Sequence, residues 1–262
     1  FKQKTAYEIS LGLVGSEMCI RDRSSCLFNG RNMKTVYFAQ INNVIAEATF
    51  LPLSVAYIWE YCKQTVDNWQ LGGILFERET VEQYVDKIVD PDIVAISTYV
   101  WNWDISRELA QAVKRSYPKC TVVMGGPHVP ANQKWLSENT DICDIIVTYA
   151  GERVFAELLK GNLNTPGIMT VGSYIAPKPD KYIDDIPSPY LSGLMDSLMQ
   201  PGKNYSAIIE TNRGCPYRCT FCDQEAVYYN KIAKFDYDRV IQEIDWVAKN
   251  KIEFLYFRYS ET

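Results

Sequence analysis

Ile93-Val94-Ala95-Ile96-Ser97 gives the clearest strand pattern of the chain, because four apolar residues follow one another before the first hydroxyl. Such an uninterrupted run is typical of a strand whose sheet is covered on both faces. A helical stretch over residues 105–116 follows, and the next apolar run, 121–124, leads into Gly125-Gly126-Pro127. A strand, a helix and a second strand in this order predict a parallel sheet.

The same alternation extends in both directions along the chain. We expect further strands at 36–41, 71–76 and 144–147, and further helices at 52–63, 81–89 and 152–159. Five strands that alternate with helices within about 130 residues predict an α/β fold with a doubly wound, flavodoxin-like parallel sheet.

Ligands of doubly wound sheets bind beyond the carboxyl ends of the strands. Two glycines follow one of these strands, and glycine lets the backbone approach a ligand closely. An ordinary turn at the two glycines, and a packed rim of Trp101 and Trp103, are the alternatives. The candidate ligand-binding residues are Gln40, Asn42, Ser97, Thr98, Tyr99, Gly125, Gly126, Pro127, His128, Gly151 and Glu152.

Three cysteines, Cys215, Cys219 and Cys222, follow a strand predicted at 205–209 with the spacing Cys-x-x-x-Cys-x-x-Cys. Thiolates this close together can each bind one iron of a [4Fe-4S] cluster, which leaves the fourth iron without a protein ligand. That iron could chelate a substrate or a cofactor. A zinc site is the alternative, but zinc prefers four ligands in paired spacings, and no Cys or His follows Cys222.

The motif Cys215-x-x-x-Cys219-x-Phe221-Cys222 resembles the signature of the radical S-adenosylmethionine (SAM) enzymes. The resemblance implies that the three cysteines bind a [4Fe-4S] cluster and that Phe221 contacts SAM. It also implies that an electron from the cluster cleaves SAM to methionine and a 5′-deoxyadenosyl radical, which abstracts hydrogen from a substrate.

A second resemblance covers residues 33–175. A strand that ends in Ser97, a strand that ends in Gly-Gly-Pro-His, and Gly151-Glu152 at the start of a helix, all before the cysteine motif, resemble the cobalamin-binding domain of the cobalamin-dependent radical SAM enzymes. This implies that the candidate ligand-binding residues contact cobalamin and that the enzyme transfers methyl groups or rearranges its substrate.

One departure from that pattern concerns the axial ligand. The Asp-x-His-x-x-Gly motif, by which many cobalamin domains supply a histidine, is absent, and His128 is the only histidine of the chain. His128 fits a turn residue as well as a ligand contact. The alternative function is a non-catalytic module that binds a corrinoid or flavin and passes electrons to an iron–sulfur cluster.

The remaining segments define the predicted domains. Residues 176–200 have the proline-rich, charged composition of a linker. Residues 201–262, with a helix expected at 237–249 and a strand at 254–257, resemble the start of the partial (β/α) barrel of radical SAM enzymes. We expect that barrel to be truncated here, the fragment to be inactive alone, and residues 33–175 to fold without the rest.

Residues 2–9 and 13–22 resemble in-frame translations of sequencing-adapter DNA. Residues 1–32 are therefore predicted to be a non-native or disordered leader, with Met33 as the expected start. A short amphipathic targeting peptide is the alternative.

The composition bounds the expected partners and compartment. The net charge is −5 and no basic run occurs, so neither nucleic acid nor a membrane is an expected partner. The cysteines lack the pattern of a secreted disulfide framework, and a cluster needs a reducing compartment, which favours the cytoplasm. The expected partners are a small-molecule or peptide substrate and a reductant such as flavodoxin or ferredoxin.

Overall fold

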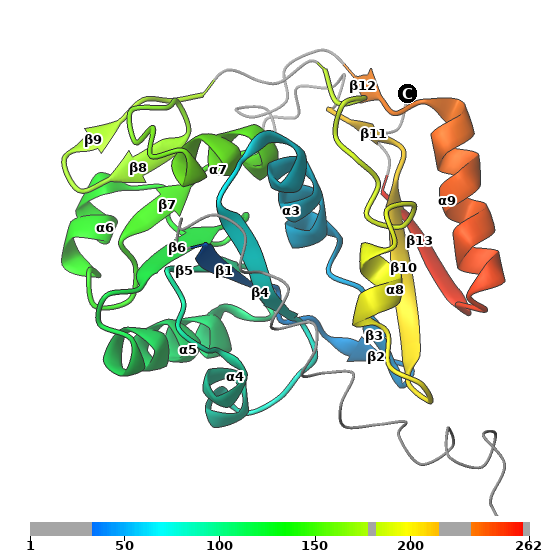
Figure 1. The fold of residues 1–262 in the computed structure, drawn as a ribbon, viewed down its shortest axis with the longest axis horizontal. Helices are drawn as coiled ribbons and strands as arrows, with labels where there is room; N and C mark the ends of the chain where they lie inside the picture. Colours follow the sequence, from blue (N-terminus) through cyan, green and yellow to red (C-terminus); the bar gives the residue numbers. More distant parts are fainter. Residues whose placement is uncertain (1–32, 178–181, 215–231, 259–262) are drawn as a thin grey trace, which may run out of the picture. The chain divides into compact units, whose positions relative to one another are not determined.

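The computed structural model describes residues 33–177, 182–214 and 232–258. The larger of its two main sheets has seven strands in the order β4-β1-β5-β6-β7-β8-β9 (Figure 1). The bounds of these strands are Trp69–Leu75 for β4, Lys34–Ala39 for β1, Ile93–Ser97 for β5, Thr121–Gly125 for β6, Ile145–Val147 for β7, Ile168–Thr170 for β8 and Ser173–Tyr174 for β9.

The first five strands of this order are parallel. Numbered along the chain they run 2-1-3-4-5, which is the order of flavodoxin-like sheets. The prediction of an α/β fold with a parallel sheet is therefore confirmed. The strands β8 and β9 extend the sheet as an antiparallel hairpin. The sequence did not predict them, because two or three residues are too few to show an alternating pattern.

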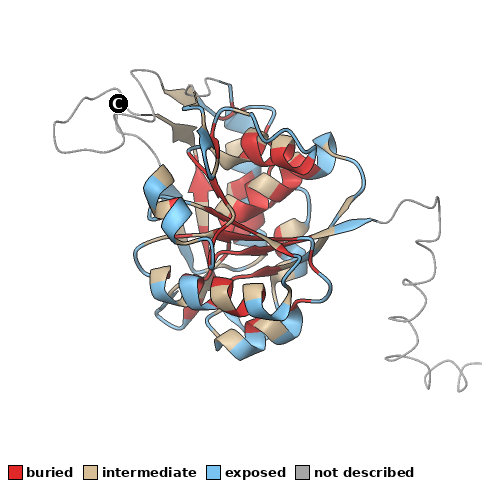
Figure 2. Cartoon of the chain, turned by 90° about the vertical axis from the view of Figure 1, so that its left-hand side faces the viewer, coloured by how far each residue is buried: buried red, intermediate tan, exposed pale blue. Residues whose placement is uncertain are grey.

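Helices cover both faces of this sheet, and each face has its own core. Because successive side chains of a strand point to opposite faces, Val36 and Phe38 of β1 enter one core, whereas Tyr37 and Ala39 enter the other. Figure 2 shows the buried residues gathered in the strands and on the inward sides of the helices. The helices are α3 (Leu53–Thr65) and α7 (Gly151–Leu159) on the first face, and α4 (Val81–Lys87), α5 (Trp103–Ser116) and α6 (Gln133–Glu138) on the second.

The second sheet combines strands from distant parts of the chain. Its order is β13-β10-β3-β2, and β10 pairs in parallel with both β13 and β3. The segment that follows β1 thus leaves the first sheet and adds an edge to the second. The turn between β2 and β3 consists of Ala46 and Glu47, both at positive φ, as a type I′ hairpin requires. The bounds are Phe254–Arg258 for β13, Asn204–Glu210 for β10, Ala48–Phe50 for β3 and Val44–Ile45 for β2.

The segment predicted to be a linker packs against this second sheet. Ile183, Ile186 and Tyr190 are almost completely buried and belong to the same core as β10. These apolar residues stand singly among prolines and charged residues. The composition of the segment therefore indicated a linker and gave no sign of the buried contacts. The remaining elements are α8 (Leu194–Leu198), β11 (Asn212–Arg213), β12 (Ala233–Lys234) and α9 (Tyr237–Lys249).

The predicted leader, residues 1–32, lies outside the described residues. No helix in the described part of the chain combines the length and the apolar character that a membrane span requires.

Candidate functional site

A cavity of about 990 Å³ lies at the carboxyl ends of the parallel strands. Its walls are the segments after β1, β5, β6 and β7, the start of α3, and residues of β10, β11 and β13. Nine of the eleven candidate residues from the sequence line it, so the structure brings these distant positions together. They are Gln40, Asn42, Ser97, Tyr99, Gly125, Gly126, Pro127, Gly151 and Glu152.

Thr98 and His128, the other two candidates, do not line the cavity. Thr98 is fully buried, and its hydroxyl donates to the carbonyl oxygen of Gly125 at 2.8 Å. The exposed ring of His128 contacts Trp103 edge-on, with 5.2 Å between the ring centroids. Thr98 therefore joins the segments after β5 and β6, and His128 lies on the surface beside α5.

Gly126 is required by the packing of these two segments. Its φ is +94°, and a Cβ atom at this position would lie 2.4 Å from the carbonyl oxygen of Thr98. A side chain would therefore clash with backbone as well as strain the residue. The sequence predicted that the glycine backbone would approach a ligand closely, whereas the backbone of Gly126 closely approaches that of Thr98 in the neighbouring loop.

Two buried amides organise the start of α3. Gln40 Oε1 accepts a hydrogen bond from the backbone N–H of Val55 in the first turn of that helix, at 3.2 Å. Asn42 Nδ2 donates to the carbonyl oxygen of Phe50 at 2.8 Å, which closes the segment that carries β2 and β3. The residue before α3 is Pro52, which makes no side-chain cap, so Gln40 supplies an acceptor that the local sequence lacks.

Asn102 is a further polar residue of this region, and the sequence analysis did not select it. Its Nδ2 donates to the carbonyl oxygens of Ile41 (3.0 Å) and Ser97 (3.1 Å), and its Oδ1 accepts from the N–H of Tyr99 (2.7 Å). These bonds connect the ends of β1 and β5, between which the strand order reverses. An asparagine just before a helix predicts an N-cap, yet this side chain caps nothing, so sequence reasoning had no means to find its role.

An aromatic pair forms part of the cavity wall. The rings of Tyr99 and Trp101 are stacked, with centroids 4.5 Å apart and an interplanar angle of 10°. The hydroxyl of Tyr99 is hydrogen-bonded to that of Ser54 at 2.9 Å, which fixes the tyrosine against α3. Trp101 is 44% exposed, so one face of the stack can contact a bound molecule.

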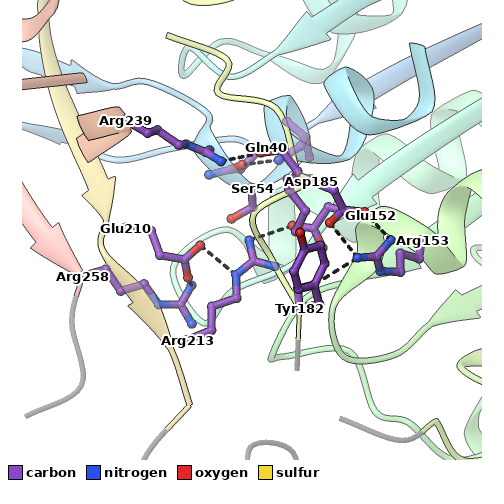
Figure 3. Close-up of polar contacts among 12 residues, drawn as sticks. Gln40, Ser54, Glu152, Arg153, Tyr182, Asp185, Glu210, Arg213, Arg239 and Arg258 are labelled. Atoms are coloured by element: carbon purple, nitrogen blue, oxygen red, sulfur yellow. Dashed lines mark hydrogen bonds and ion pairs between the residues drawn. The ribbon is translucent and has the colours of Figure 1, made fainter. Parts of the chain in front are cut away.

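Charged side chains of α7, β10, β11 and β13 form a further part of the cavity wall (Figure 3). Arg213 donates to Glu152 Oε1 at 2.7 Å and to Glu210 Oε2 at 2.8 Å, and Arg258 lies 3.6 Å from the other oxygen of Glu210. Burial disfavours the charged form of Arg213, but the two carboxylates outweigh burial and raise its pKa above the usual value. Glu152, a candidate from the sequence, is thus held in an ion pair.

Comparison with known proteins agrees with this geometry. Residues 41–159 match the family model of the B12 binding domain. This B12-binding region contains every part of the cavity wall that belongs to the first sheet except the end of β1.

The chain is also related in sequence to cobalamin-dependent radical SAM methyltransferases. It is 34% identical over 242 residues to the cobalamin-dependent radical SAM methyltransferase TokK of Streptomyces tokunonensis, a match that covers 85% of this chain and 35% of TokK. It is 33% identical over 245 residues to the 2-(S-pantetheinyl)-carbapenam-3-carboxylate methyltransferase of Streptantibioticus cattleyicolor. That match covers 86% of this chain and 35% of the methyltransferase. The chain thus spans about a third of the length of these curated relatives.

A solved structure shares the fold. The radical SAM methyltransferase TsrM from Kitasatospora setae, solved with its tryptophan substrate and a SAM analogue, superimposes with a TM-score of 0.61 over 87% of this chain and 48% of TsrM. The two sequences are 15% identical, so this likeness concerns the fold alone.

The cavity has the size of a small-molecule or cofactor site. Ligand sites usually have volumes of roughly 300–1,000 Å³ and mainly apolar walls, and the cavity of about 990 Å³ reaches the upper end of that range. The only histidine of the chain, His128, does not line the cavity, so it is not placed as an axial ligand.

The predicted cluster and SAM residues, Cys215, Cys219, Cys222 and Phe221, lie outside the described residues. Within the described ranges, no group of three or more His, Cys, Asp or Glu side chains is arranged to bind a metal ion. The described cysteines, Cys62, Cys120 and Cys143, are free, buried thiols. Burial raises the pKa of the Cys120 and Cys143 thiols to about 12, so both stay protonated and unreactive near neutral pH.

Proposed function

We propose that this chain is the corrinoid-binding part, and the beginning of the radical SAM part, of a cobalamin-dependent radical SAM methyltransferase. The observation that carries the proposal is the cavity at the carboxyl ends of the parallel strands, because nine residues chosen from the sequence for this role line it together. Its position at the point where the strand order reverses is the usual ligand site of such sheets.

The residues of the cavity, together with Asn102 behind it, would divide the work of binding. Gln40, Asn42 and Asn102 hold the loops in place, so that little ordering remains to be done when a ligand enters. The stacked rings of Tyr99 and Trp101 offer apolar contact and exclude water. A bound corrinoid would supply the methyl carrier, and a bound cluster with SAM would supply the radical chemistry.

The proposal gives the cysteine motif its role by sequence. Cys215, Cys219 and Cys222 would hold a [4Fe-4S] cluster, and Phe221 would contact SAM. The strands β10 and β13 would be the first two strands of the partial barrel. The substrate would be a small molecule or a peptide, and a flavodoxin or ferredoxin would supply electrons in the cytoplasm.

Corrinoid binding is tested by titrating the 262-residue chain with cyanocobalamin, using the visible spectrum and equilibrium dialysis. Ser97→Phe places a ring in the cavity wall, so we expect affinity to fall at least tenfold, roughly 1.4 kcal/mol. His128→Ala is the control, and its affinity should match the wild type because His128 lies off the cavity. No binding by the wild type, or equal affinity in Ser97→Phe, would contradict the proposal.

Cluster binding is tested by anaerobic reconstitution followed by visible and EPR spectra. Cys219→Ala should lose the cluster signal, whereas Cys120→Ala, which removes a buried thiol outside the motif, should keep it. Release of 5′-deoxyadenosine from SAM under reduction separates the proposed enzyme from a non-catalytic electron-transfer module. A cluster signal that persists unchanged in Cys219→Ala would contradict the assignment of the motif.

A further inference from the structure

Arg213 connects the B12-binding region to the second sheet. Its Nη2 donates to Glu152, in the first turn of α7, and its Nε donates to Glu210, the last residue of β10. A single guanidinium group therefore holds one carboxylate from each side. Figure 3 shows Arg213 between these two acidic side chains.

The ion-paired group is nearly shielded from water. The side chains of Arg213, Glu152 and Glu210 are 11%, 6% and 3% exposed. Charges in such surroundings interact more strongly than on the surface, and the loss of one partner leaves the others buried without compensation. The guanidinium carbon also lies 5.6 Å from the ring centroid of Tyr57 and 5.8 Å from that of Phe235. The position of Arg213 is thus fixed by contacts with four other residues.

The same three side chains line the cavity. A molecule that enters the cavity and contacts Glu152 must therefore act on Arg213, and through Arg213 on Glu210 and β10. Arg213 itself belongs to β11, and only Gly214 separates it from Cys215 in the sequence.

We propose that Arg213 is a positioning residue that couples the binding of a corrinoid in the cavity to the arrangement of β10 and β11. The inference rests on the proposed function, because it takes a corrinoid as the occupant. Coupling between two sites is reciprocal, so a change at Arg213 weakens corrinoid binding as well as the response of the second sheet.

The two hydrogen bonds need the shape of an arginine. The planar guanidinium group presents separate N–H groups to Glu152 and Glu210, whereas the ammonium group of lysine is a point charge on a flexible stem. Arg213→Lys keeps the charge and should lose part of the coupling, and Arg213→Gln should lose nearly all of it.

Hydrogen–deuterium exchange of the 262-residue chain, with and without saturating cyanocobalamin, measures the coupling. In the wild type we expect cyanocobalamin to slow exchange across residues 204–213 as well as in the loops of the first sheet. In Arg213→Gln the slowing should be confined to those loops, and the affinity for cyanocobalamin should fall on the order of tenfold, a usual size for such coupling. Arg153→Gln is the matched control, because Arg153 is likewise an arginine paired with a carboxylate, that of Asp185, but it does not line the cavity.

The outcomes separate this inference from the function on which it rests. If the wild type does not bind cyanocobalamin, both fail. If the wild type binds it but residues 204–213 are not protected, or if Arg213→Gln keeps that protection, only the inference fails. A purely structural role would lower stability in Arg213→Gln and leave the protection unchanged. If Arg213→Gln does not fold, the test uses Arg213→Lys instead. Cyanocobalamin that protects residues 204–213 of this variant as fully as those of the wild type would overturn the proposal.

Discussion

Single residues hold the loops of the cavity through buried hydrogen bonds, and Asn102 makes the most of them. In Asn102→Asp the shape is kept, but a carboxylate replaces the donor that faces two carbonyl oxygens. We expect the free energy of unfolding to fall by about 1–3 kcal/mol, the usual cost of an unsatisfied buried group. Urea unfolding measures it. Asn43→Asp is the control. Asn43 is near the surface and accepts a hydrogen bond from Arg78, so a carboxylate there should leave the free energy of unfolding almost unchanged.

Gly126 offers a second test at this scale. Gly126→Ala forces a Cβ atom against the backbone of Thr98 and strains a residue at positive φ, so we expect a loss of about 1–3 kcal/mol and weaker cyanocobalamin binding. Gly161→Ala has a similar φ, but no heavy atom would lie within 4 Å of the new Cβ. Its cost should be limited to backbone strain, with corrinoid affinity unchanged. Equal effects of the two substitutions on binding would contradict the role assigned to Gly126.

The buried thiols should make the free energy of unfolding fall as the pH becomes alkaline. Burial raises the pKa of Cys120 and Cys143 to about 12, whereas an unfolded thiol titrates near 8.5. The unfolded state therefore loses these protons first, so the stabilisation is complete below about pH 8.5 and is lost as pH rises toward 12. Each thiol contributes a slope of up to about 1.4 kcal/mol per pH unit. Urea unfolding at pH 8 and pH 10.5 should show a smaller difference in Cys143→Ala than in the wild type.

At the scale of elements, the hairpin of β2 and β3 joins the two sheets, since β3 follows β1 in the chain but pairs with β10. Replacing residues 44–49 by a short Gly-Ser linker removes β2 and most of β3 from the second sheet. We expect faster hydrogen–deuterium exchange across β10, and little change in β5 and β6 of the first sheet. Replacing the exposed turn of the β8–β9 hairpin at Val171 and Gly172 is the control. Unchanged protection of β10 in the first variant would show that β3 contributes nothing to the second sheet.

The same hairpin shows what the sequence could predict and what it could not. Long alternating units were found within a few residues of their bounds, as with α9, because apolar periodicity and capping residues such as Asp236 are local. The pairing of β3 with β10 and the bond from Asn102 to Ile41 escaped notice because these partners are distant in sequence. For the same reason, the rule on strand ends brought most candidates to the cavity but did not find Arg213, whose importance depends on Glu152 in another part of the chain.

At the scale of the whole molecule, one core extends from the first sheet into the second. It includes Phe38 of β1, residues of α3 and α7, and Ala207 and Ile209 of β10. Figure 1 shows α3 between the two sheets, and the aromatic contacts of Tyr57 with Phe235 and of Phe76 with Tyr205 cross the same boundary. The other core, beneath α4 and α5, lies within the first sheet and its helices.

This division predicts how a chain that ends at residue 177 will behave. It should still form the first sheet, because five parallel strands with helices on both faces remain. The truncation uncovers Tyr57 and Phe76, however, and exposed apolar surface costs about 25 cal/mol per Å². We therefore expect a native-like far-UV spectrum, a lower urea midpoint than that of the 262-residue chain, and increased binding of the dye ANS. Equal midpoints without added dye binding would show that the second sheet contributes nothing to the shared core, and loss of helical signal would show that the first sheet cannot fold without it.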